Sequence, residues 1–203
     1  MSAAFAIIPA AGRSRRMGRP KLLLPWKGET VLEHLLSRWK ASRVDRIVVV
    51  AHVEDVELHH RCQAVGVDLV VPEVPPAEMK DSVAAGLAHV AQRFSPSRRD
   101  AWLLAPADMP RLSPIVIDRL LDEHSAQADR PVILAPSFEG RRGHPVLFPW
   151  PLAAEVAALT SEQGVNAIVD RHPVREVAVD EPGVLADLDT PEDYRRLREE
   201  GSP

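Results

Sequence analysis

The sequence predicts one α/β domain built on a mostly parallel or mixed sheet that is flanked by helices. Short apolar or β-branched runs alternate with stretches whose apolar residues recur at helical spacing, which is typical of strands and helices in turn. The chain has 203 residues, 45% of them hydrophobic and 27% charged, so it can bury a large core. Neither an internal repeat nor an interdomain linker interrupts the pattern, and we expect a single domain over residues 1–203.

The predicted strands are short runs, most of them rich in valine, isoleucine and leucine. Branched side chains favour strands because they pack well on a pleated surface. In chain order the predicted strands are Phe5–Pro9, Arg46–Ala51, Asp68–Val71, Ala101–Ala105, Val132–Ala135, Pro145–Phe148 and Val174–Val179.

The predicted helices carry start signals. Thr30 is the expected N-cap of the first helix, and Glu33 three residues later completes a capping box. Thr190 caps the last helix, with Pro191 at its first position. In chain order the predicted helices are Val31–Ala41, Glu54–Ala64, Ser82–Arg93, Pro114–Ser125, Leu152–Leu159, Gly164–Asp170 and Pro191–Glu199.

Charge and composition exclude several classes of protein. Lys and Arg total 25 against 29 Asp and Glu, which gives no whole-protein reason to expect binding to nucleic acid or an anionic membrane. The single cysteine, Cys62, cannot form an internal disulfide. Apolar runs such as Ile47–Ala51 are far shorter than the roughly 20 residues that span a bilayer. We therefore expect a cytoplasmic protein.

A loop rich in cations follows the first predicted strand. Five of the nine residues from Arg13 to Lys21 are arginine or lysine. A turn of small residues at a strand end lets backbone N–H groups approach phosphate oxygens, so the loop predicts a di- or triphosphate site. Gly12 and Gly18 fit neither a Walker A loop nor a dinucleotide-binding fingerprint. The alternative is a solvated basic turn.

Residues 10–22 read AAGRSRRMGRPKL. This run resembles the signature loop of the nucleotidyltransferases related to the molybdenum-cofactor enzymes, in which Gly-x-Ser-x-Arg-Met-Gly-x-x-Lys wraps the triphosphate of an NTP. The Ala-Ala-Gly form is similar to the cytidylyltransferase branch, whereas the guanylyltransferase branch usually reads Ala-Gly-Gly. The resemblance continues through residues 107–110, 142–146 and 187–193. It implies a Rossmann-like domain of the nucleotide-diphospho-sugar transferase type.

The resemblance implies roles for most of the loop. Arg16 and Lys21 would act in catalysis together with Asp108, by neutralising charge on the phosphates. Nucleotide-binding residues would come from the loop and from the start of a later helix. They are Ala10, Ala11, Gly12, Arg13, Ser14, Arg15, Gly18, Met79 and Ser82.

Asp108 follows an apolar run, which places it at the same sheet edge as the loop if the strands are parallel. A carboxylate there suits Mg²⁺, which usually takes one or two carboxylates together with phosphates and waters. The alternative is a turn or cap residue before Pro110. The resemblance implies that Asp108 is the principal Mg²⁺ ligand.

Asp187 and Asp189 share one face of an extended segment because side chains two residues apart lie on the same side. Either carboxylate could complete a metal site. The alternative is a helix start, since Thr190 and Pro191 follow directly. The resemblance implies that this pair lies near the metal, and it favours Asp187 as a ligand ahead of Asp189.

Two further motifs bear on the substrates. Gly143 and His144 resemble the acceptor-binding motif of the cytidylyltransferase branch, although a lone histidine is often structural.

The family commonly reads Gly-Met-x-x-Ser-Leu where this chain has Glu78 before Met79. A carboxylate repels phosphate at close range, so either Glu78 points away or the nucleotide preference differs.

The residues and the resemblance together predict cytidylyl transfer from CTP, or from another NTP, to molybdopterin. Mg²⁺ would be the cofactor, pyrophosphate the leaving group, and a molybdenum hydroxylase a candidate recipient of the product. Three alternatives stay open. They are GTP-dependent guanylyl transfer to molybdopterin, transfer to a sugar or polyol phosphate, and a non-catalytic nucleotide-binding regulator on the same fold.

Overall fold

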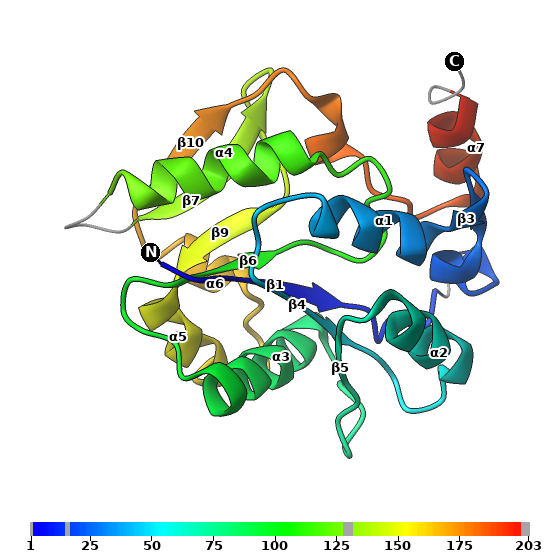
Figure 1. The fold of residues 1–203 in the computed structure, drawn as a ribbon, viewed down its shortest axis with the longest axis horizontal. Helices are drawn as coiled ribbons and strands as arrows, with labels where there is room; N and C mark the ends of the chain where they lie inside the picture. Colours follow the sequence, from blue (N-terminus) through cyan, green and yellow to red (C-terminus); the bar gives the residue numbers. More distant parts are fainter. Residues whose placement is uncertain (1, 15–16, 128–131, 200–203) are drawn as a thin grey trace.

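The computed structural model describes residues 2–14, 17–127 and 132–199. Within these ranges, eight strands form one mixed sheet in the order β10-β7-β9-β6-β1-β4-β5, with β8 paired to β7 (Figure 1). The strands are β1 Ala4–Pro9, β4 Arg46–Val50, β5 Asp68–Val70, β6 Ala101–Leu104, β7 Ile133–Phe138, β8 Arg141–Arg142, β9 Val146–Pro149 and β10 Val174–Ala178. The α/β fold predicted from the sequence is confirmed.

Strand β1 is central, and its parallel neighbours β4 and β6 direct three carboxyl ends toward one edge of the sheet. The strand β9 instead runs antiparallel to β6 and β7. Seven residues, 139–145, separate β7 from β9, whereas a parallel pair needs a crossover of about a dozen or more. This short connection explains why the sheet is mixed.

Helices cover both faces of the sheet. They are α1 Val31–Lys40, α2 Val56–Val65, α3 Met79–Phe94, α4 Pro114–Ser125, α5 Ala153–Ala157, α6 Asn166–Val169 and α7 Pro191–Glu199. Ala6 and Ile8 of β1 belong to the core shared with α1, α2, α4 and α7. Phe5 and Ile7 belong to the core shared with α3, α5 and α6, and Figure 1 shows α3 beside α5. The alternation along β1 therefore builds two apolar layers.

Short elements complete the fold. A two-stranded hairpin of β2 Pro25–Trp26 and β3 Glu29–Thr30 precedes α1 and is absent from the sequence prediction. The 3-10 turns are η2 Lys21–Leu23, η3 Trp150–Leu152 and η4 Pro182–Leu185. The helix predicted over Leu152–Leu159 is therefore split between η3 and α5, and the one predicted over Gly164–Asp170 is reduced to α6.

The start of α3 differs from the prediction, which placed it at Ser82. The helix begins at Met79, three residues earlier. The carboxylate of Asp81 accepts hydrogen bonds from the backbone N–H of Ala77 at 3.1 Å and of Glu78 at 2.9 Å. An acid at the third helical position that reaches back to these amides fixes the earlier start.

Cys62 is fully buried, and burial raises the pKa of its thiol to about 12, so the thiol is not a nucleophile at neutral pH. Across the described residues, none of the helices combines the length and apolar character that crossing a bilayer requires.

Candidate active site

A cavity of about 780 Å³ opens at the sheet edge where β1, β4 and β6 end. Parallel strands that end together place their following loops around one crevice, which is where α/β sheets bind ligands. Each of these three strands is followed by residues that line the cavity, and the start of α3 and the segment before α7 close it. The lining residues are Pro9–Ser14, Lys21, Leu22, His52, Pro75–Met79, Ser82, Pro106–Asp108 and Asp189.

The loop after β1 folds back on itself. Ser14 adopts a left-handed φ of 47°, and its Oγ accepts a hydrogen bond of 3.2 Å from the backbone N–H of Lys21. Met17 is buried and anchors the loop to the core. Gly18, which the sequence assigned to nucleotide binding, has a φ of 63° and does not line the cavity, so its glycine serves the turn.

Ala10, Ala11, Gly12, Arg13 and Ser14 all line the cavity, as expected for the phosphate loop. The two predicted residues that follow them, Arg15 and Arg16, lie outside the described residues.

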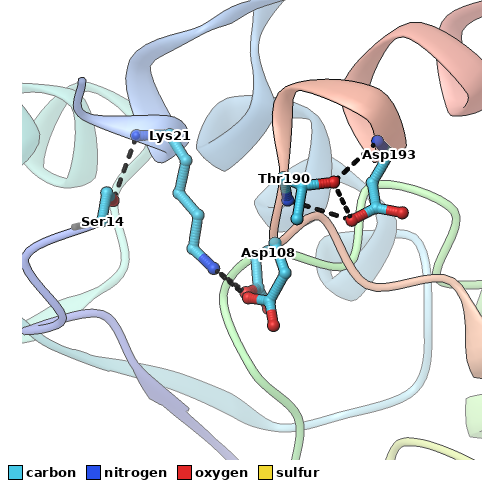
Figure 2. Close-up of polar contacts among 6 residues, drawn as sticks. Ser14, Lys21, Asp108, Thr190 and Asp193 are labelled. Carbon is cyan, nitrogen blue, oxygen red and sulfur yellow. Dashed lines mark hydrogen bonds and ion pairs between the residues drawn. The ribbon is translucent and has the colours of Figure 1, made fainter. Parts of the chain in front are cut away.

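Lys21 lies between two carboxylates, and Figure 2 shows its contact with the first of them, Asp108. Its Nζ donates to Oδ2 of Asp108 in a close contact and to Oδ1 of Asp189 at 3.0 Å. The Lys21 and Asp108 side chains are 17% and 12% exposed, so the pair is largely withdrawn from water. A cation and two carboxylates from three distant parts of the chain thus meet at one end of the cavity.

The charges of this group depend on one another. Burial lowers the pKa of Lys21, but the ion pairs and hydrogen bonds with Asp108 and Asp189 outweigh it and raise that pKa above its ordinary value. Burial raises the pKa of Asp108, and the neighbouring Lys21 ammonium opposes this shift only in part. Lys21 therefore stays an ammonium over the whole physiological range.

A hard divalent cation fits this end of the cavity. Oδ1 of Asp108 is buried and has no hydrogen-bond partner among the described residues, which is the state of a carboxylate oxygen that can accept a ligand. The described residues contain no preformed cluster of three or more metal-ligating side chains. Mg²⁺ needs only one or two carboxylates when phosphates and waters supply its other ligands, so the residues suit a metal that arrives with a nucleotide.

The two acids before α7 are placed differently. Asp189 lines the cavity and contacts Lys21, whereas Asp187 is exposed and outside the lining. Thr190 Oγ1 and the Asp193 carboxylate cap α7, so Asp193 serves the helix start (Figure 2). Buried Leu188 donates its N–H to the Asp108 carbonyl oxygen at 2.9 Å and directs the chain into the site. Asp189 rather than Asp187 thus faces the cavity, whereas the resemblance favoured Asp187 as the metal ligand, and the metal role of both stays a prediction.

His144 lies beside this group but not in the cavity lining. Burial lowers the pKa of its imidazole. A hydrogen bond to the Leu104 carbonyl and the charges of Asp108 and Asp187 act to raise that pKa, but they do not outweigh burial. The ring atom Nδ1 is buried without a partner among the described residues. His144 is therefore a neutral ring close to the acidic group.

Gly143 has a packing role that the sequence did not indicate. A Cβ at this position would lie 2.3 Å from the carbonyl oxygen of Val184. We expect Gly143→Ala to lower the free energy of unfolding by roughly 1–3 kcal/mol, because backbone must move to admit the methyl group. Thermal melting checks this, with Gly164→Ala as control, since a Cβ there meets nothing within 4 Å. Equal melting temperatures for both variants would contradict it.

His52 is a cavity residue that the sequence reasoning missed. It is 6% exposed, and its Nε2 lies 3.2 Å from Nη2 of Arg13, which also donates to Oε2 of Glu54 at 3.0 Å. His52 directs Arg13 along the wall of the cavity. Its place directly after the predicted strand Arg46–Ala51 is the signal that could have identified it.

The opposite end of the cavity is formed by the start of α3. Met79 and Ser82 line it as expected, the first half exposed and the second buried. Glu78 also lines it, and its carboxylate takes part in the capping box at the start of α3 and pairs with Lys80. Pro75, Pro76 and Ala77 complete this end and were not expected from the sequence.

Comparisons with known proteins agree on the type of protein. The family model described as MobA-like NTP transferase domain matches residues 6–177. The molybdenum cofactor cytidylyltransferase of Escherichia coli K12 is 27% identical over 98% of this chain and 97% of its own length. The 2-C-methyl-D-erythritol 4-phosphate cytidylyltransferase of Azoarcus sp. BH72 is 40% identical over 59% of this chain, which spans about half (51%) of that protein.

The fold matches solved structures. The crystal structure of Rv0371c from Mycobacterium tuberculosis H37Rv is similar with a TM-score of 0.82 and 32% identity, over 98% of this chain and 99% of that one. A second structure of that protein is a complex with manganese and has a TM-score of 0.78, with 32% identity and the same coverage of both chains. Since the family model covers most of the chain and the fold matches a relative with 32% identity, this chain belongs to the family of MobA-like NTP transferases and is a nucleotidyltransferase.

Proposed function

We propose that this protein transfers CMP from CTP to the terminal phosphate of molybdopterin and releases pyrophosphate. The observation that carries the proposal is the Lys21 ammonium held between Asp108 and Asp189 beside the phosphate loop. An oxygen of the acceptor phosphate attacks the α-phosphorus in line. The new bond joins that oxygen to phosphorus, and the bond to the bridging oxygen breaks, so that pyrophosphate carries away the electron pair.

The protein's own residues bind and neutralise the triphosphate. Ala10 to Ser14 line the cavity, and because the Ala10 N–H already donates to the Val50 carbonyl oxygen, the N–H groups from Ala11 to Ser14 would be the ones that phosphate oxygens approach. Lys21 contributes a charge that opposes the negative charge developing on the leaving group. Arg16 is the further cation that we assign to this task from the sequence.

Asp108 and Asp189 would hold Mg²⁺, which supplies Lewis-acid polarisation of the phosphates when bound. The Oδ1 of Asp108, which has no partner in the part of the chain that the structure describes, and the manganese complex of the Mycobacterium tuberculosis protein support a divalent cation. Asp187 lies farther out and would at most contact metal-bound water.

The assignment of CTP and molybdopterin rests on three observations. The Ala-Ala-Gly loop start is similar to the cytidylyltransferase branch, and the E. coli molybdenum cofactor cytidylyltransferase aligns over 98% of this chain. The charge of Asp108 acts on the His144 imidazole, and we assign Gly143 and His144 to the acceptor phosphate from their resemblance to the cytidylyltransferase motif. In this proposal a molybdenum hydroxylase receives the product.

A second acceptor has specific support. The Azoarcus relative is named for 2-C-methyl-D-erythritol 4-phosphate and is 40% identical in the aligned part. That reaction shares CTP and the attack of a phosphate monoester, so it would use the same residues. The regulator alternative is disfavoured because a pure nucleotide binder has no need for Lys21 between two buried or half-buried acids.

We expect faster pyrophosphate release with CTP than with GTP, ATP or UTP, and only when molybdopterin is present. The measurement is a panel of the four NTPs with Mg²⁺, each without acceptor, with molybdopterin, and with 2-C-methyl-D-erythritol 4-phosphate. Faster release with GTP would refute the choice of base. Release with the polyol phosphate alone would refute the choice of acceptor while the enzyme class survives.

A further inference from the structure

The two ends of the cavity are built differently. Lys21 and Arg13 lie on the side of the loop after β1, together with Asp108 and Asp189, while Glu78 lies at the start of α3. The N-terminus of a helix often binds anions, but here the Asp81 carboxylate already accepts from the N–H groups of Ala77 and Glu78. The proposed function places the triphosphate at the loop after β1, where Lys21 and small residues line the cavity, and the carboxylates of Glu78 and Asp81 disfavour phosphate at the start of α3.

The proposed position of the triphosphate decides which part of a nucleotide lies next to Glu78. The ribose joins the phosphates to the base, so the base is the part farthest from Lys21 when the triphosphate contacts the loop. Pro76 and the exposed Met79 line the same end and offer apolar surface to a flat ring. The base and the Glu78 carboxylate then share one end of the cavity.

Glu78 is held in place by a buried lysine. Oε2 of Glu78 lies 3.2 Å from Nζ of Lys80, whose side chain is 10% exposed. Lys80 Nζ also donates to the carbonyl oxygen of Thr160 at 2.5 Å, which anchors the lysine to the loop after α5. A carboxylate has about four acceptor sites, so the pair with Lys80 and the capping bond from the Asp81 N–H leave Glu78 able to accept from a ligand.

We propose that Glu78 is a specificity residue that accepts a hydrogen bond from the exocyclic amino group of cytosine and so disfavours uracil. The inference rests on the proposed function, in which CTP is the donor. Cytosine and uracil have the same shape but present an amino donor or a carbonyl acceptor at the same ring position. A carboxylate attracts the first and repels the second, so polarity alone separates the two nucleotides.

The test is equilibrium binding of CTP and UTP without an acceptor, by titration calorimetry, to the full chain. We expect the wild type to favour CTP over UTP by about tenfold or more, because a site that hydrogen-bonds one group rejects the analogue lacking it. In Glu78→Gln the ratio should fall about tenfold, since the amide can also donate to uracil. Glu73→Gln, an exposed acid outside the cavity lining, should keep the wild-type ratio.

Because Glu78→Gln leaves Lys80 without its carboxylate, Glu78→Asp provides a second variant that keeps the charge. It should retain a preference for CTP over UTP of intermediate size. An unchanged ratio in Glu78→Gln, or an equal loss of CTP and UTP binding, would overturn the inference. A wild type that prefers CTP while Glu78→Gln keeps the ratio leaves the proposed function standing. A wild type without that preference overturns both.

Discussion

Replacement of Asp108 by asparagine is expected to lower the rate of pyrophosphate release by roughly 10²- to 10³-fold. The amide keeps the size of the side chain but removes one full charge from the buried end of the cavity, where Oδ1 has no partner within residues 2–14, 17–127 and 132–199. Affinity for Mg²⁺ should fall as well, because a carboxylate is the protein's main contribution to such a site. Rates measured against Mg²⁺ concentration separate the two effects.

The matched controls for this variant are the same Asp→Asn substitution at aspartates that contact Lys21 less closely or not at all. Asp170→Asn, at an exposed helix end, should leave rate and metal dependence unchanged. Asp189→Asn should cost more rate than Asp187→Asn, because only Asp189 contacts Lys21 in the cavity. Wild-type turnover of Asp108→Asn at saturating Mg²⁺ would refute the metal-ligand role.

Stability is an independent readout for Asp108. A carboxylate among other acids would be repelled in the absence of metal, and its removal would then stabilise the protein. Here Lys21 already neutralises Asp108, so the variant loses an ion pair and retains only Asp189 as a partner for Lys21. We therefore expect a modest fall in melting temperature together with the large loss of rate.

The sequence predicted the positions of the cavity walls well because they follow strand ends. Phe5–Pro9 and Ala101–Ala105 are apolar runs whose burial dictates their conformation, and parallel pairing then places Gly12 and Asp108 at one edge. The capping box at Thr30 and Glu33 is present as expected, because it depends only on residues three apart. Local rules and burial therefore sufficed for most of the fold.

What the sequence did not predict depends on contacts between distant segments. The meeting of Lys21, Asp108 and Asp189 joins residues 87 and 168 positions apart, and no local pattern indicates which acid faces the lysine. The need for glycine at Gly143 likewise arises from the approach of Val184, far along the chain. The position of Glu78 in the cavity required the earlier start of α3.

Replacement of Lys21 by methionine is expected to have opposite effects on catalysis and on metal binding. Turnover should fall by about 10²-fold or more, because a cation that opposes charge on the phosphates is lost. Affinity of the nucleotide-free protein for Mn²⁺ should instead rise, because Oδ2 of Asp108 and Oδ1 of Asp189 are released from the ammonium. Calorimetric titration of Mn²⁺ without nucleotide measures the second effect, independently of activity.

The control is Lys27→Met, since Lys27 is exposed and outside the cavity lining. It should leave both turnover and Mn²⁺ affinity at wild-type values. If Lys21→Met kept wild-type turnover, the basic loop would be a solvated turn rather than a phosphate site. If turnover fell without a gain in Mn²⁺ affinity, Lys21 would still neutralise charge on the phosphates. Asp108 and Asp189 would then not form a metal site for which Lys21 competes. The two measurements together therefore test whether Lys21, in the protein without nucleotide, occupies the position between Asp108 and Asp189 that the metal takes when a nucleotide binds.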